Sequence, residues 1–353
     1  MHPKEEEPSR WASIEYARGI AALSVAFFHF TNGSSWFHDG ILKSVGHYGY
    51  LGVMVFFVIS GFVIPLSLYR LDFDWRRDSA DFLLRRIVRL EPPYLLSCLL
   101  VVVLDKLSSL APAFRGDVSH DMYYLIWHPL YLVPWVNASW LNPVYWSLAI
   151  EFQFYFFALI IAPIFLTKYA SLARGVLALT LMASFVPSSG NLLFPYLPLF
   201  VMGFVGFLGF RRLFSRVEQA AWLTGAFLCC INSTDLSAAV GGLIGLALIM
   251  LPWPGGIKIL TFFGGISYSL YLLHVPIGSR VTNLSMRISS DPSLQTAAFV
   301  LAMVLSILAA YIFSRVVERR SIDWSRSFKR KKPKDILIDK TSAEAAPIRT
   351  PPC

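Results

Sequence analysis

The chain has 353 residues, of which 56% are hydrophobic and only 15% are charged, and its formal net charge at pH 7 is +9. Soluble domains carry roughly 25% charged residues, so this composition excludes a soluble fold with an ordinary charged surface. The positive charge lies in the C-terminal tail and between apolar segments, which argues against nucleic acid as a partner and is typical of membrane topology.

The first residues do not have the composition of a cleavable signal peptide. Glu5, Glu6 and Glu7 stand where such a peptide carries basic residues. We therefore expect the first apolar segment to be retained as a helix. The four cysteines have no spacing typical of a zinc site or a disulfide framework, so the sequence predicts no metal centre.

Ten segments are predicted to span a membrane, for which roughly 20 mostly apolar residues are needed. They are residues 13–30, 49–69, 92–110, 144–166, 172–187, 191–210, 218–232, 236–253, 257–278 and 295–314. With the N-terminus inside, the cytoplasmic segments hold 25 of the 31 Lys and Arg residues and the outer segments hold five. This bias agrees with the positive-inside rule. The sequence thus predicts an all-α, polytopic membrane protein with both termini in the cytoplasm.

The expected domain organisation follows from these spans. It comprises a cytoplasmic N-terminus (1–12), a transmembrane domain (13–314) and a basic, disordered cytoplasmic tail (315–353). The longest outer segment, 111–143, is rich in tryptophan and tyrosine, which suit the membrane–water interface. We expect it to form a short interfacial or re-entrant element.

Three ionisable residues inside the predicted spans stand out, because such groups are costly in a membrane and point to function. Arg18 and His29 are eleven residues apart, which places them on nearly one face of a helix, with His29 about 16 Å further outward. Glu151 lies roughly 10 Å from the outer end of its helix. The sequence therefore predicts that Glu151 and His29 meet at a similar depth.

A basic pair precedes the third span. Arg86 and Arg89 are three residues apart and share a helical face. Guanidinium groups suit phosphate oxygens. Together with Arg18, which lies near the same membrane surface, they could form a phosphate-binding mouth that faces the cytoplasm.

Structural interpretations of the same residues remain open at this point. Arg18 could snorkel to the membrane surface, and Arg86 and Arg89 could be topological anchors. His29 could be a packing histidine, and Glu151 a buried partner of an arginine. If all four structural interpretations held together, several buried ionisable groups would have no function.

Five segments form an ordered set of motifs. They are the arginine-ten-residues-histidine spacing of Arg18 and His29, residues 52–62, the RxxR segment from Arg86 to Arg89, residues 146–153 (WSLAIEFQ) and residues 266–274 (ISYSLYLLH). This set resembles the motifs of the acyltransferase-3 family of membrane-bound acyltransferases. The sequence departs from the family pattern at Met54, where an acid is common, and after Glu318, where a proline is expected.

The resemblance implies a multi-pass enzyme of the cell membrane, which in a bacterium is the inner membrane. It implies transfer of an acyl group, which we expect to be acetyl, from cytoplasmic acyl-coenzyme A to a hydroxyl of a carbohydrate or glycoconjugate. Arg18, Arg86 and Arg89 would then bind the phosphates of the donor. His29 would be the general base, and Glu151 would orient its imidazole.

Two other classes of function remain as alternatives. A transporter or flippase of a lipid-linked or small amphiphilic substrate could use the buried ionisable groups as a proton relay, although a relay does not need the cytoplasmic arginines. A non-catalytic membrane scaffold would need neither the buried ionisable groups nor the cytoplasmic arginines.

Overall fold

Helices make up all the regular secondary structure that the computed structural model describes, which covers residues 7–33, 35–71, 73–110, 125–136, 138–166, 169–188 and 191–328. The helices are α1 (Glu7–Thr31), α2 (Ile41–Gly46), α3 (Gly52–Arg70), α4 (Trp75–Ser109), α6 (Tyr145–Phe165), α7 (Ala170–Ala183), α8 (Leu197–Phe210), α9 (Arg216–Ser233), α10 (Leu236–Met250), α11 (Lys258–Ile288), α12 (Pro292–Phe313) and α13 (Arg319–Ser327). The predicted all-α class is confirmed.

Each of the ten expected spans overlaps one helix, namely α1, α3, α4 and α6 to α12. Within the described residues, five helical segments are long and apolar enough to cross a membrane: Ile41–Arg70, α4, α6, α11 and Pro292–Ser327. Three further apolar helices, Ala170–Ala183, Phe194–Phe210 and Leu236–Met250, are shorter. These segments are consistent with a membrane protein, and the number of ten spans remains a prediction.

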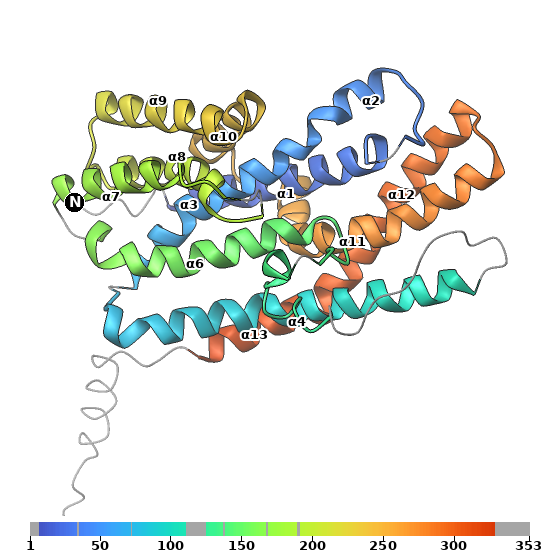
Figure 1. Cartoon of the computed structure of the whole chain (residues 1–353), viewed down its shortest axis with the longest axis horizontal. Helices are drawn as coiled ribbons and strands as arrows, with labels where there is room; N and C mark the ends of the chain where they lie inside the picture. Colours follow the sequence, from blue (N-terminus) through green and yellow to red (C-terminus); the bar gives the residue numbers. More distant parts are fainter. Residues whose placement is uncertain are drawn as a thin grey trace, which may run out of the picture.

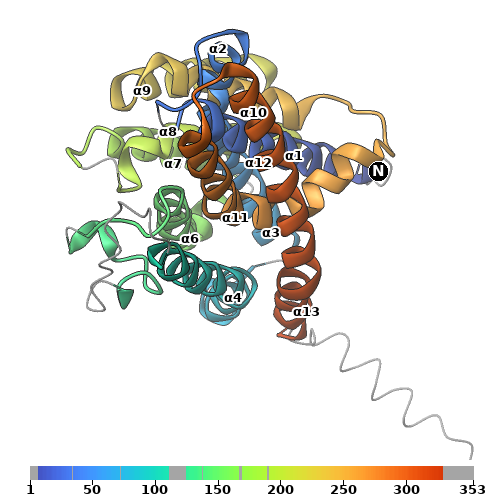
Figure 2. The same cartoon turned by 90° about the vertical axis from the view of Figure 1, so that its right-hand side faces the viewer.

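The helices lie roughly alongside one another (Figures 1 and 2). α1 packs against α11 and α3, and α3 packs in turn against α8 and α10. α4 and α13 lie side by side along the lower edge of Figure 1. α1, the helix that carries both Arg18 and His29, thus packs on helices from both the N-terminal and the C-terminal parts of the chain.

Two glycines allow α3 and α8 to cross at close range. A Cβ atom on Gly203 of α8 would overlap the carbonyl oxygen of Val58, and one on Gly61 of α3 would overlap the backbone of Phe200. Small residues at such crossings let helix backbones approach closely, which is how helices associate where lipid weakens the hydrophobic driving force.

We therefore expect Gly203→Ala to destabilise the fold, because overpacking a tight contact typically costs about 1–3 kcal/mol. The midpoint of thermal unfolding of the purified protein should fall by several degrees. Gly175→Ala on α7 is the matched control, since a Cβ there meets nothing within 4 Å. Equal unfolding midpoints for the two variants would contradict the close crossing.

The C-terminal helix continues beyond the predicted domain boundary. A single π-helical turn, Ser314–Glu318, joins α12 to α13, and α13 packs against α4. Glu318 is buried in this turn, and its carboxylate accepts a hydrogen bond of 2.5 Å from the hydroxyl of Ser269. Residues 315–327 are therefore helical where the sequence analysis expected disorder, with Glu318 bonded to α11 and α13 packed against α4. Disorder remains a prediction for residues 329–353, which lie outside the described residues.

The outer segment between α4 and α6 is described for residues 125–136 and 138–144. It contains one 3-10 turn, Val133–Trp135, and is fixed to the bundle by side chains. His128 is buried and accepts a hydrogen bond from the amide of Leu141 (3.1 Å), and Tyr131 stacks on Tyr94 of α4 at 4.8 Å. Its location at the membrane interface remains a prediction, as does any structure of residues 111–124.

The predicted topology can be measured with a reporter that is active only outside the cytoplasm. Fusions at Ser79, in the first turns of α4, and at Arg349 should be silent, whereas a fusion at Ser119 should be active. Ser119 and Arg349 lie outside the described residues. A signal at Arg349 would mean an odd number of spans and would contradict the ten-helix prediction.

Candidate active site

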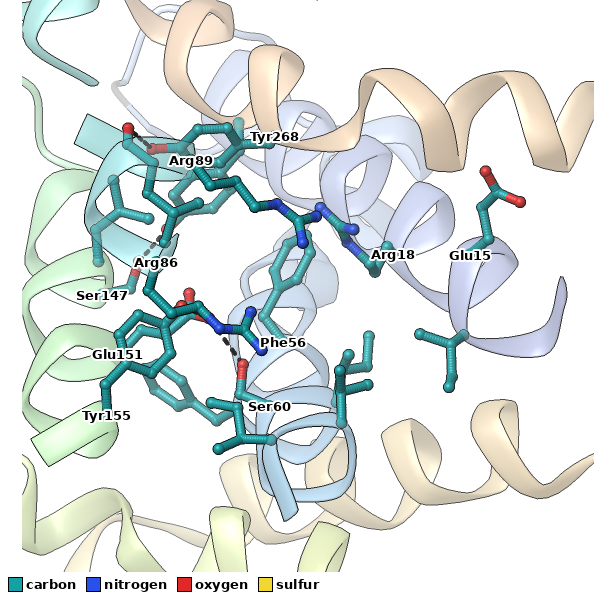
Figure 3. A pocket seen from close by; sticks show the side chains of 18 of the residues that line it. Glu15, Arg18, Phe56, Ser60, Arg86, Arg89, Ser147, Glu151, Tyr155 and Tyr268 are labelled. Atoms are coloured by element: carbon teal, nitrogen blue, oxygen red, sulfur yellow. Dashed lines mark hydrogen bonds between the residues drawn. The ribbon is translucent and has the colours of Figure 1, made fainter. Parts of the chain in front are cut away.

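A cavity of about 480 Å³ lies between α1, α3, α4, α6 and α11 (Figure 3). Its walls combine aromatic and aliphatic side chains with four arginines, two glutamates and two serines; Glu15 of α1 and Arg326 of α13 are among these polar residues. The lining includes Arg18, Phe56, Ser60, Arg86, Arg89, Ser147, Glu151, Tyr155, Tyr268 and Tyr271. Four of the five site residues predicted from the sequence therefore share one cavity.

The three predicted arginines form one group in this cavity. The guanidinium groups of Arg18 and Arg89 point toward each other from α1 and α4 (Figure 3). The guanidinium of Arg86 lies over the rings of Phe82 and Tyr155, at 5.3 and 5.5 Å from their centroids. Among the described residues, none of the three forms an ion pair with a carboxylate. Glu15, the nearest acid along α1, points away from Arg18 (Figure 3).

This arrangement favours an anion. Like charges that share a partly enclosed space repel one another more strongly than they would in water. A ligand with several negatively charged oxygens would relieve that repulsion and would form charge-assisted hydrogen bonds with the guanidinium groups. Neighbouring turns of α4 supply two of the arginines, as their three-residue spacing predicts.

Glu151 lies on the opposite wall, on α6. One oxygen of its carboxylate accepts hydrogen bonds from the hydroxyls of Ser60 (2.9 Å) and Tyr155 (2.6 Å). These bonds fix the carboxylate between α3 and α6. The expected contact of Glu151 with His29 is not formed within the described part of the chain, because the rotation of α6 turns the carboxylate toward α3.

His29 does not line the cavity. Its ring faces His274 of α11, with ring centroids 5.2 Å apart. Tyr271 lines the cavity, and its ring also neighbours His274, with ring centroids 6.0 Å apart. Its hydroxyl is 2.5 Å from the hydroxyl of Ser147, and its ring packs edge-on against Phe56. Tyr271 therefore contacts both the cavity and the histidine pair.

His274 is the residue that the sequence reasoning missed. It is fully buried. Two features of the sequence point to it: it ends the motif 266–274, and it is an ionisable residue inside a predicted span. The helix-rise arithmetic that placed His29 would also have found it. His274 is 17 residues from the inner end of its predicted span and His29 is 16 from the inner end of its own, so both lie about 25 Å along their helices.

Comparison with known proteins gives a family match. The sequence matches the acyltransferase domain of the acyltransferase-3 family over residues 11–315. It is 33% identical to the candidate peptidoglycan O-acetyltransferase YrhL of Bacillus subtilis over 191 residues, which cover 50% of this chain and 27% of that protein. It is 29% identical to the peptidoglycan O-acetyltransferase OatA of Listeria monocytogenes over 154 residues, 40% of this chain and 22% of that protein.

A relative of similar size comes from a virus. The candidate acetyltransferase ORF330 of Acidianus two-tailed virus is 26% identical over 290 residues, which cover 74% of this chain and 82% of that protein. The chain thus spans about a quarter of the length of the two peptidoglycan relatives and most of the viral one. No solved structure matches the chain.

Proposed function

This chain belongs to the acyltransferase-3 family, and from that premise we propose that it is a membrane-bound O-acyltransferase. It would transfer an acyl group, most simply acetyl, from cytoplasmic acyl-coenzyme A to a hydroxyl of a carbohydrate or glycoconjugate. The observation that carries this proposal is the cavity in which Arg18, Arg86 and Arg89 meet without carboxylate partners among the described residues.

The donor fits this cavity chemically. Coenzyme A carries several phosphate groups on a nucleotide, joined to a thin pantetheine arm that ends in the thioester. Phosphates prefer guanidinium groups, and the arm is thin enough for a cavity of about 480 Å³. With the phosphates bound to the arginines, the thioester would lie toward Tyr271 and Ser147, which also line the cavity.

The proposed reaction uses His29 as the general base. The acceptor hydroxyl would give its proton to the imidazole while its oxygen attacks the carbonyl carbon of the thioester. The carbon–sulfur bond then breaks, and the thiolate of coenzyme A leaves and takes the proton back from the imidazolium. In this proposal the acyl carbon would approach His29 from the side of the cavity that Tyr271 lines.

Glu151 is proposed to act from the cavity wall and not through an imidazole. Its carboxylate orders the hydroxyls of Ser60 and Tyr155, and Tyr155 in turn supports the guanidinium of Arg86. We therefore propose that Glu151 helps to orient the donor. It also provides a negative charge near the arginines when the donor is absent.

The acceptor class rests on the relatives. Two of them are named for O-acetyl transfer to peptidoglycan, so a carbohydrate hydroxyl is the proposed acceptor. The proposed location is the cell membrane, in a bacterium the inner membrane. The donor would enter from the side that the positive-inside rule assigns to the cytoplasm.

The experiment that tests the proposal is binding and turnover of labelled acetyl-coenzyme A by the purified full-length protein. We expect saturable binding and slow release of acetate, with water as the acceptor. S-acetyl-pantetheine, which has the same thioester but lacks the nucleotide phosphates, is the matched control and should bind much more weakly. Failure to bind acetyl-coenzyme A would favour the alternative, a transporter that uses the buried ionisable residues as a proton relay.

A further inference from the structure

The environment of His274 fixes where its proton lies. Its ring nitrogen Nδ1 is 2.9 Å from the carbonyl oxygen of Leu270. A carbonyl oxygen can only accept, so Nδ1 carries the proton and donates it. The other nitrogen of the neutral ring, Nε2, then has a lone pair. Nε2 is buried and has no hydrogen-bond partner among the described residues.

An unsatisfied buried lone pair is costly, so a donor near it would be favoured. The aromatic neighbours of His274 are Phe30, Tyr271 and His29. Phe30 has no polar atom, and the hydroxyl of Tyr271 is already engaged with Ser147 and with the carbonyl oxygen of Val144. The N–H of the His29 ring is the donor that remains among these neighbours.

The separation of the two rings suits such a bond. Two imidazoles joined by an N–H···N hydrogen bond of ordinary length have centroids about 5 Å apart. The centroids of His29 and His274 are 5.2 Å apart with an interplanar angle of 50°. At this separation, the bond requires an N–H of the His29 ring to be turned toward Nε2.

We propose that His274 is a positioning residue for His29, which donates one ring N–H to Nε2 of His274. This bond would fix the tautomer of His29. It would leave the lone pair of the other ring nitrogen free to take the proton of the attacking hydroxyl. The inference deepens the proposed function and rests on His29 as its base. A neutral imidazole would thus do what a carboxylate does in a catalytic triad, without placing a further charge inside the membrane.

Two substitutions separate this role from packing. In His274→Gln the side-chain oxygen reaches the place of Nε2 and can accept the N–H of His29. In His274→Asn the amide reaches only the place of Nδ1 and can bond to Leu270 alone. Each variant is assayed as full-length protein for acetyl-coenzyme A affinity, acetate release per folded molecule and thermal stability.

We expect His274→Gln to keep turnover within roughly threefold of the wild type, and His274→Asn to lose about 10²-fold or more, because a base held in the wrong tautomer loses most of its effect. Donor affinity should be unchanged in both. Equal losses in the two variants would mean that His274 takes the proton itself, and would overturn the proposal. Loss of stability with normal turnover per folded molecule would overturn it in favour of packing.

A spectroscopic readout does not depend on activity. In protein with ¹⁵N-labelled histidine, the chemical shifts report which ring nitrogen carries a proton, and His29→Ala and His274→Gln assign the signals. We expect a hydrogen-bonded Nε2 at His274 and a single tautomer at His29, which becomes mixed in His274→Asn. An unbonded Nε2 at His274 would overturn the inference even in an active enzyme. Wild-type protein with this bond but no turnover would overturn the proposed function instead.

Discussion

Replacing His29 with alanine should lower turnover by about 10²–10⁴-fold, the usual cost of losing a general base, while donor affinity stays close to that of the wild type. The reason is geometric. His29 is not among the residues that line the cavity that holds the arginines. Its removal should therefore leave the donor's binding contacts intact. The measurement is acetate release from acetyl-coenzyme A per folded molecule, with donor binding recorded on the same sample.

A structural role for His29 predicts a different result. The variant would then show lower yield or lower thermal stability, with turnover per folded molecule largely kept. His47→Ala is a suitable control, because that side chain is exposed, lies in the 3-10 helix His47–Leu51 and does not line the cavity. Near-normal turnover in folded His29→Ala protein would remove His29 from the mechanism.

The double substitution Arg86→Ala and Arg89→Ala should weaken acetyl-coenzyme A binding by about 10²-fold or more. Each charge-assisted hydrogen bond to a phosphate contributes roughly 1.5–3 kcal/mol, and about 1.4 kcal/mol corresponds to a tenfold change in affinity. Wild-type binding should also weaken as salt rises, to the extent that the site is solvated. The measurement is the dissociation constant of labelled acetyl-coenzyme A at two salt concentrations.

Arg85→Ala is the matched control for this pair. Arg85 precedes Arg86 on the same helix, but its guanidinium bonds to the carbonyl oxygen of Asp81 and does not line the cavity. Its removal changes the net charge of the chain as much as either of the other substitutions, yet it should leave donor affinity within about twofold. Unchanged affinity in the double variant would show that the arginines do not bind the donor.

The sequence predicted the helices well because hydropathy and segment length are sufficient for that purpose. All ten expected segments overlap helices of the structure. It also predicted that the three arginines lie together, since Arg86 and Arg89 share a face by spacing alone and the predicted topology puts Arg18 near the same membrane surface. For these residues, distance along a helix and position within a turn determine which side chains meet.

The sequence could not predict which side chains face each other across the bundle. Depth placed Glu151 and His29 at one level, but depth leaves the rotation of each helix undetermined. That rotation is set by packing, and it turns Glu151 toward Ser60 and His29 toward His274. The length of the C-terminal helix was likewise underestimated, because the partners of Glu318 and α13 lie on helices distant in sequence.

The arginine cavity has a consequence for how such an enzyme would respond to metabolism. Arg18, Arg86 and Arg89 would recognise phosphates, which acyl-coenzyme A and free coenzyme A share in full, so most of the binding energy would not distinguish donor from product. Uniform binding of this kind lowers the concentration needed for saturation but does not speed the chemical step. The released coenzyme A would compete with the next donor molecule for the same three side chains. The rate of acylation would then follow the ratio of acylated to free coenzyme A in the cell, and so the supply of acetyl units, more closely than the concentration of donor alone.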